Sequence, residues 1–223
     1  MTRAITILLA LLVPLAAPAQ APAPAPAPAS LAPRVQFETS AGNFVVELDT
    51  VRAPLTAENF LRYVRDGGYD GTVFHRVIAN FVVQGGGYDD RLAARAPRAP
   101  IPNESGNGLS NRRGTLGLAR EDSPHSGSSQ FYINLVDNAG LDPMPSRWGY
   151  AVFGRVVEGM DVVDRIGYMR TETVASFGTD VPVERPLVKR AWVIEPDVAT
   201  APAAQPPPAT QPPPEEAEAD PAQ

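Results

Sequence analysis

The stretch from Phe74 to Gly87 constrains the fold most strongly, because it holds two short apolar runs, separated by Ala79-Asn80 and followed by three glycines. Runs of this kind predict two β-strands. Each contains one polar side chain that a buried strand disfavours, Arg76 in the first and Gln84 in the second. A charge among apolar side chains costs free energy unless it faces water or a ligand. The pair is therefore predicted to line a cleft, or to lie on an edge strand whose polar groups reach solvent; this stretch alone leaves both open.

The central part of the chain otherwise predicts a mainly β domain with two helices. Further strands are expected at 35–38, 43–48, 116–119, 130–135, 151–157 and 187–195. One helix should begin at Pro54, end at Gly67-Gly68, and bury a stripe at helical spacing formed by Ala57, Phe60, Leu61 and Val64. A second helix is expected at 160–166. Residues 88–113 and 168–186 are predicted to be loops, and Gly85–Gly87 a tight turn.

The two ends of the chain differ from this centre. Residues 1–19 have a positive end, a short apolar run and a small-x-small cleavage pattern, which predicts a signal peptide cleaved after Ala19 and a periplasmic or secreted protein with no remaining membrane span. Residues 20–33 are an Ala/Pro-rich linker, expected to be a polyproline II spacer. Residues 198–223 are predicted to form a disordered, Pro-rich acidic tail. The folded domain should therefore cover 34–197.

Charge and cysteine content narrow the function. The net charge of −6 argues against a nucleic-acid partner. The absence of cysteine excludes disulfides, thiolate nucleophiles and cysteine-based zinc sites, and no cofactor or metal is expected. His75 and His125 are interpreted as structural. Because His75 adjoins Arg76, strand alternation predicts that their side chains point to opposite faces. A monomer is expected.

Three blocks of sequence carry a resemblance to a known family. They are FHRVIANFVVQGGG at 74–87, GTLGLAR with GSSQFYI at 114–120 and 127–133, and GYAVFGRVVEGMDVV at 149–163. In this order and spacing they resemble the cyclophilin family of peptidyl-prolyl cis-trans isomerases. The resemblance implies a closed eight-stranded antiparallel β-barrel capped by two α-helices. It also implies an enzyme that acts on proline-containing peptides. Together with the predicted signal peptide, this leads us to expect that unfolded exported proteins are its partners and that it accelerates their folding.

Rotation about the bond before proline needs no nucleophile, because no bond is made or broken. The barrier of about 20 kcal/mol comes from lost amide resonance. A cation aimed at the prolyl nitrogen would bind the twisted amide better than the planar one. Arg76 is the candidate for that cation. By resemblance, the catalytic set is Arg76, Phe81 and Gln84, and the substrate-binding set is Val82, Ala119, Arg120, Gln130, Tyr132, Leu141 and Tyr150.

Some positions depart from the family, and some alternatives stay open. Val82 stands where many relatives have methionine, and Tyr132 where many have phenylalanine; Gly140 replaces a tryptophan that packs on cyclosporin, so tight cyclosporin binding is not expected. Arg76 could instead form a structural salt bridge. A non-catalytic module that binds proline-containing peptides, and a scaffold that docks a partner through its acidic tail, are the alternatives in function.

Overall fold

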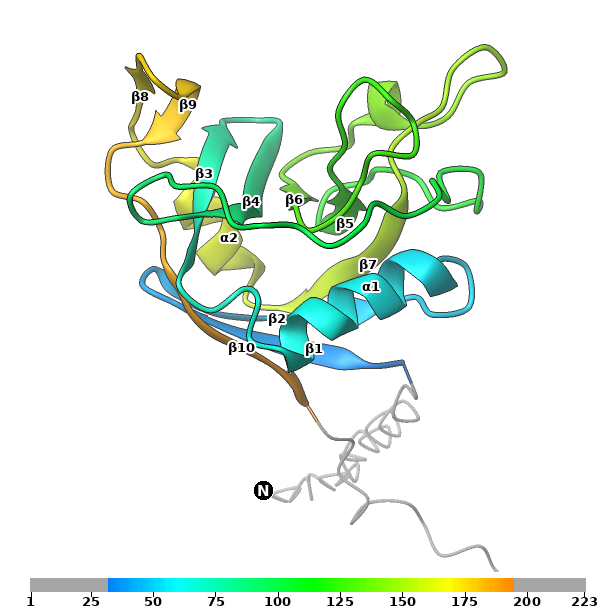
Figure 1. The fold of residues 1–223 in the computed structure, drawn as a ribbon, viewed down its shortest axis with the longest axis horizontal. Coiled ribbons are helices and arrows are strands. Elements are labelled where there is room, and N and C mark those ends of the chain that lie inside the picture. The colour runs from blue at the N-terminus through cyan, green and yellow to red at the C-terminus, as the bar shows by residue number, and fades with distance from the viewer. Residues whose placement is uncertain (1–31, 195–223) are drawn as a thin grey trace, which may run out of the picture. The chain divides into compact units, whose positions relative to one another are not determined.

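The computed structural model describes residues 32–194, and the predicted signal peptide, nearly all of the linker and the acidic tail lie outside these residues. Eight strands form one curled antiparallel sheet in the order β10-β1-β2-β7-β5-β6-β4-β3 (Figure 1). The strands are β1 (Arg34–Thr39), β2 (Gly42–Leu48), β3 (Thr72–Ile78), β4 (Val82–Asp89), β5 (Thr115–Leu118), β6 (Phe131–Asn134), β7 (Val152–Glu158) and β10 (Val188–Ile194). The predicted mainly β, eight-stranded architecture is confirmed.

The prediction that this barrel is closed was slightly too strong. Its first and last strands, β10 and β3, meet near an isolated bridge between Val73 and Leu187 rather than along a full ladder of described residues. Two backbone bonds reinforce the bridge, one from Gly71 N to the Val188 carbonyl (2.8 Å) and one from Phe74 N to the Pro186 carbonyl (3.0 Å). The seam thus joins the two edges over a short length, while the remaining neighbours form longer antiparallel ladders, several of which are interrupted by register shifts.

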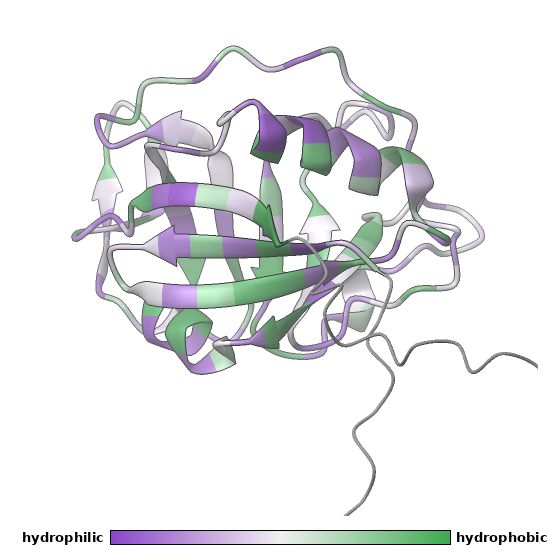
Figure 2. Ribbon diagram, turned by 90° about the horizontal axis from the view of Figure 1, so that it is seen from below, coloured by the Kyte–Doolittle hydropathy of each residue, from purple (hydrophilic) through white to green (hydrophobic). Residues whose placement is uncertain are grey.

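Two helices, α1 (Pro54–Arg65) and α2 (Met160–Gly167), cover opposite ends of the barrel and turn their hydrophobic faces toward the strands (Figure 2). The predicted stripe of α1 is buried, and Phe60 reaches the centre of the core. Its ring lies 5.1 Å from that of Tyr69, 5.4 Å from that of Phe131 and 5.1 Å from that of Phe153. Aromatic contacts therefore link α1 to β6, to β7 and to the segment before β3, and burial of these rings stabilises the fold.

Two segments differ from the sequence-based expectation. The predicted loop at 168–186 contains a hairpin, β8 (Thr171–Val174) and β9 (Gly178–Pro182). The three glycines at 85–87 lie inside β4 rather than in a turn. Gly86 has φ +87°, and a Cβ there would lie 2.9 Å from both the Ser129 carbonyl oxygen and the Tyr69 ring. Close packing, rather than chain reversal, requires glycine here. No helix within 32–194 is long and apolar enough to cross a membrane.

The N-terminus of α1 is capped from a distant loop. Its own N-cap position, Ala53, offers no side-chain hydrogen bond. Instead the Glu104 carboxylate accepts bonds from the backbone N–H of Leu55 (3.1 Å) and Thr56 (2.8 Å) and from the Thr56 hydroxyl (2.7 Å). An anion at this end of a helix satisfies exposed donors and complements the helix dipole.

Glu104→Ala should therefore lower the free energy of unfolding by about 2 kcal/mol, because these donors would lose a charged acceptor. Urea unfolding followed by circular dichroism would measure the change. Glu172, an exposed residue of β8, supplies the matched control. Glu172→Ala should change stability by less than about 0.5 kcal/mol, and an equal effect of both variants would contradict the capping role.

Candidate functional site

Arg76 and Gln84 face each other on neighbouring strands, as directly paired residues of β3 and β4. Arg76 donates from Nη1 to Gln84 Oε1 (3.3 Å), and Gln84 Nε2 donates to Gln130 Oε1 (2.9 Å). A Cβ on Gly87 would lie 2.6 Å from Gln130 Cγ, so the glycine makes room for that side chain. Both ends of the Gln84 amide are held, and the three half-buried side chains form one continuous polar chain.

A β-bulge at His75 sets the direction of Arg76. The register runs from Phe74 opposite Gly85 to Arg76 opposite Gln84, so two steps on β3 match one on β4. Phe74 and Val77 both belong to the core cluster, which leaves His75 and Arg76 together on the outer side. The prediction that these two side chains point to opposite faces is therefore wrong, because a bulge adds one residue and interrupts the alternation.

Phe81 and Val82 lie where β4 begins, next to this polar chain. The Phe81 carbonyl accepts hydrogen bonds from Leu135 N (2.9 Å) and from Asn138 Nδ2 (3.0 Å), which fixes its backbone. Val82 is buried but lies outside the main core cluster, and it shares a strand face with Gln84 by alternation. The two apolar side chains thus belong to the same region as Arg76.

Tyr132 occupies the cross-strand position opposite Gln84, and its hydroxyl donates to Asn111 Oδ1 (2.6 Å). Asn111 is fully buried and in turn donates from its backbone N (2.8 Å) and from Nδ2 (2.9 Å) to Asp142. Burial raises the pKa of Tyr132 well above its ordinary value, so the hydroxyl remains a donor. Burial would raise the pKa of Asp142, but hydrogen bonds from Ser110 and Asn111 lower it overall, so the carboxylate remains an acceptor.

Tyr132→Phe should lower the free energy of unfolding by about 1 kcal/mol, because the buried Asn111 oxygen would lose its shortest hydrogen bond. Chemical denaturation would measure the difference. Tyr168, which is 73% exposed, provides the same substitution at the surface. If Tyr168→Phe proved as costly as Tyr132→Phe, the loss could not be assigned to the buried hydrogen bond.

The remaining predicted residues lie on the other side of Tyr132. The Tyr132 and Tyr150 rings meet edge-on at 5.9 Å, and Tyr150 N donates to the Leu141 carbonyl (2.9 Å) in the short 3-10 helix η1 (Ala139–Leu141). The Arg120 guanidinium lies 4.5 Å from the centre of the Tyr150 ring. Ala119 N donates to the Gln130 carbonyl (2.9 Å), which returns to the polar chain. The structure thus brings the ten predicted site residues into one region.

The sequence did not predict the polar residues that hold these site residues in place through hydrogen bonds. Asn111 joins Tyr132 to Asp142, and Asn138 holds the Phe81 carbonyl while donating to Asn134 (2.7 Å). Asn111 lies in a long polar stretch with no regular periodicity, so no local signal distinguishes it from a solvated loop residue. Gly140, in contrast, borders open space, because an added Cβ there would meet no atom within 4 Å.

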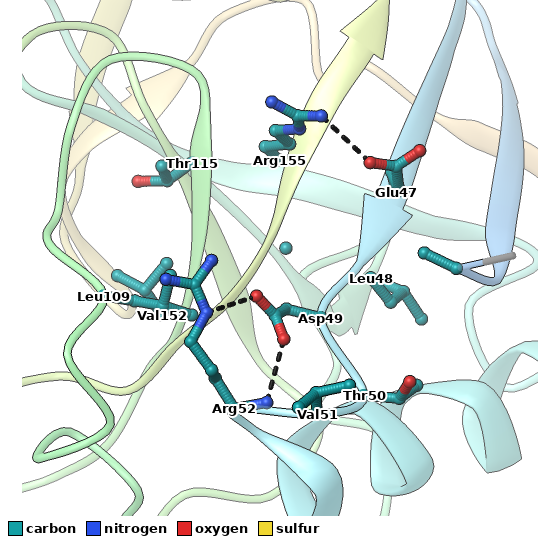
Figure 3. A pocket seen from close by; sticks show the side chains of 12 residues that line it. Glu47, Leu48, Asp49, Thr50, Val51, Arg52, Leu109, Thr115, Val152 and Arg155 are labelled. Atoms are coloured by element: carbon teal, nitrogen blue, oxygen red, sulfur yellow. Dashed lines mark hydrogen bonds and ion pairs between the residues drawn. The ribbon is translucent and has the colours of Figure 1, made fainter. Parts of the chain in front are cut away.

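A cavity of about 480 Å³ lies elsewhere, between β2, the turn that follows it, and β7 (Figure 3). None of the ten predicted residues lines it. Its charged groups pair with one another: Arg155 with Glu47 (3.0 Å) and Arg52 with Asp49 (2.7 Å). Within residues 32–194, no three histidine, aspartate or glutamate side chains are grouped in a way that could hold a metal ion.

Comparison with known proteins agrees with the resemblance in the motifs. The family described as cyclophilin type peptidyl-prolyl cis-trans isomerase/CLD matches residues 34–192. A peptidyl-prolyl cis-trans isomerase of Streptomyces antibioticus is 48% identical over 163 residues, which are 72% of this chain and 98% of that protein. Peptidyl-prolyl cis-trans isomerase B of Escherichia coli is 44% identical over 164 residues, 72% of this chain and 99% of that protein.

A solved structure of similar fold is a cyclophilin type peptidyl-prolyl cis-trans isomerase of Cryptosporidium parvum, with a TM-score of 0.59 and 23% identity over 74% of this chain and 99% of the other. At this identity the likeness concerns the fold. The match along residues 34–192 and the identity to the bacterial proteins go further: this chain is a member of the cyclophilin family of peptidyl-prolyl cis-trans isomerases.

Proposed function

We propose that this protein catalyses cis-trans isomerisation of peptide bonds that precede proline, with Arg76 as the catalytic cation. The observation that carries the assignment of Arg76 is its half-buried guanidinium, which takes part in none of the ion pairs described within 32–194. Its one described hydrogen bond goes to a neutral amide. The alternative of a structural salt bridge therefore lacks support in this part of the chain.

The proposed mechanism follows from where charge develops. As the amide twists, its nitrogen loses conjugation and becomes a better hydrogen-bond acceptor. A guanidinium donor held at that nitrogen stabilises the twisted state more than the planar one, which lowers the barrier. The bond to Gln84, itself held by Gln130, limits the rotation of Arg76. Prearranged donors of this kind need no reorganisation during the reaction.

The proline ring requires an apolar surface beside that cation. Phe81, Val82, Tyr132 and Leu141 are proposed to provide it, with Tyr150 at its border and Ala119 offering main-chain groups. Proline-containing peptides are the proposed ligands. The C. parvum protein has also been solved in the presence of the dipeptide Ala-Pro, with a TM-score of 0.58 and 24% identity to this chain.

Exchange NMR on a short Ala-Pro peptide, with and without the native protein, tests the activity. Catalysis should appear as exchange cross-peaks between cis and trans signals on a timescale far below the uncatalysed tens of seconds. Peptide binding without faster exchange would instead support the non-catalytic binding module. If the protein neither bound the peptide nor accelerated its exchange, both the isomerase and the binding-module hypotheses would be rejected.

We also propose that the mature protein acts on exported proteins in the periplasm or outside the cell. The support is sequence alone: a signal peptide at 1–19, a linker at 20–33 and an acidic tail at 198–223 around a catalytic domain at 34–197. Mass spectrometry of the protein from cell fractions tests this. A mature N-terminus at Gln20 in the exported fraction is expected, and a full-length cytoplasmic protein would contradict it.

A further inference from the structure

The side chain of Arg120 has an unusually complete set of partners beside the proposed cleft. Nε donates to the Gly149 carbonyl (3.3 Å) and Nη2 to the Trp148 carbonyl (3.1 Å). Nη1 donates to the Glu121 carbonyl (2.8 Å) and to the Asp122 carbonyl (3.3 Å). One guanidinium thus joins the loop after β5 to the loop before β7, which are distant in sequence.

The same guanidinium covers one face of the Tyr150 ring, at 4.5 Å from its centre. A planar cation over an aromatic face is attracted to it and also restricts its rotation. The edge of Tyr150 meets Tyr132, and its backbone N–H is bonded to Leu141. Arg120 therefore contacts Tyr150 at the border of the proline pocket, and through Tyr150 it can act on the proposed wall residues Tyr132 and Leu141 without touching the substrate.

Within this contact Gly149 is buried and closely packed, so the loss of its hydrogen-bond partner should displace its neighbours. A Cβ on Gly149 would lie 2.4 Å from Pro143 N. The Gly149 carbonyl accepts from Asn103 Nδ2 (3.0 Å) as well as from Arg120, and Gly149 N donates to Ser105 Oγ (3.2 Å). Closely packed atoms transmit a local displacement to their neighbours.

We infer that Arg120 is a positioning residue that clamps these two loops and thereby holds Tyr150 and Leu141 at the distance from Arg76 that seats a proline ring. This role rests on the proposed isomerase function and differs from the main-chain role that the family resemblance implies for Arg120. The clamp acts on the seat of the ring, which planar and twisted substrates share. It should therefore affect KM more than kcat.

The test measures kcat and KM separately, by NMR line-shape analysis of an Ala-Pro peptide titrated with the full chain. Arg120→Ala should raise KM by about tenfold while kcat stays within about twofold, since small misplacements of binding groups reduce affinity strongly. If Arg120 only stabilised the fold, Arg120→Ala would lower the apparent kcat and leave KM unchanged, because a fraction of the protein would be unfolded.

Two substitutions define what the clamp requires. Arg120→Lys keeps the charge but loses the planar fork, so it should not restore KM. Arg147 supplies the matched control, since it lies in the loop before β7 and its side chain donates to one carbonyl, that of Gly140 (2.7 Å), in place of the four carbonyls that Arg120 contacts. Arg147→Ala should leave both constants unchanged.

A double-mutant cycle tests the route through the ring. In a Tyr150→Leu background the aromatic face is absent, so Arg120→Ala should raise KM by clearly less than in the native protein. If Arg120→Ala unfolds the protein, as thermal unfolding would show, Arg120→Met retains the aliphatic stem and takes its place in both experiments.

The outcomes separate this inference from the proposed function. An unchanged KM in Arg120→Ala, full rescue by Arg120→Lys, or strictly additive effects in the cycle would overturn the clamp while native catalysis stands. No catalysis by the native protein would overturn the function itself, whatever the Arg120 variants do to peptide binding.

Discussion

Arg76→Ala should lower kcat/KM for an Ala-Pro peptide by about 100- to 1,000-fold, the usual effect of removing one prearranged donor from a developing charge. The loss should fall on kcat, because the guanidinium is proposed to interact with the prolyl nitrogen only when the amide twists. Arg76→Lys retains the charge without the fork of donors and should give an intermediate rate. Exchange NMR at several peptide concentrations would resolve the two constants.

The fold should survive this substitution. Arg76 is half-buried, and its described hydrogen bond goes to Gln84, whose amide keeps its bond to Gln130. Thermal unfolding of Arg76→Ala should therefore stay close to that of the native protein. Arg62, exposed on α1, gives a matched arginine control, and Arg62→Ala should leave kcat/KM unchanged. Native turnover in Arg76→Ala would disprove the proposed mechanism.

The second large effect concerns stability at mildly acidic pH. His75 is 3% exposed, and its Nδ1 has no hydrogen-bond partner among the described residues. Its ring packs against Tyr88 at 4.6 Å and Phe177 at 5.8 Å. Burial lowers the pKa of His75 from 6.5 to about 4, and the neighbouring charge of Arg76 acts in the same direction. The Val73 backbone and the Gln130 side chain oppose this shift more weakly.

The direction in which the free energy of unfolding changes with pH depends on which state, folded or unfolded, binds the proton on His75. Between pH 6.5 and about 4 the unfolded chain protonates His75 while the folded protein leaves it neutral. The unfolded state therefore gains stability as pH falls through this window. By linkage, His75 should reduce the free energy of unfolding by about 3 kcal/mol between pH 7 and pH 4. The loss should begin near pH 6.5 and level off below pH 4.

Urea denaturation at half-unit pH steps would measure this, with the native protein compared with His75→Phe. Phenylalanine suits the aromatic surroundings and does not titrate, so its curve should lack this decline, and the difference between the two curves isolates His75 from the carboxylates. His125→Ala, at an exposed histidine, should leave the decline in place. Parallel curves for the native protein and His75→Phe would contradict the buried neutral histidine.

Much of the barrel could be predicted from local pattern. The buried stripe of α1 repeats at helical spacing, and it packs as expected. The polar residues Arg76 and Gln84 interrupt apolar strands, which indicated either a cleft or an edge strand, and they prove to be cross-strand partners on the terminal strand β3 and its neighbour β4. The motif order implied the family, and the family match along residues 34–192 confirmed it.

The sequence-based predictions were wrong where the local pattern carries no information about contacts with distant segments of the chain. Three consecutive glycines suggest a turn by conformational freedom alone, yet here they leave space for Tyr69 and Gln130, which other segments bring close to β4. The hairpin of β8 and β9 lies in a stretch whose polar residues gave no alternating pattern. In both cases the deciding contacts lie outside the segment itself.

Sequence by itself thus determined the residue types at the proposed site, the strands that carry them and the family, because side-chain chemistry and short-range periodicity are properties of the chain. Only the tertiary structure decided how the side chains of those residues are oriented. The bulge that turns His75 and Arg76 to the same face depends on the register with a partner strand. The cap that Glu104 provides for α1 and the hydrogen bond from Tyr132 to Asn111 join segments far apart in the sequence. Such contacts form only when the barrel brings these segments together, since no local preference of the backbone specifies them.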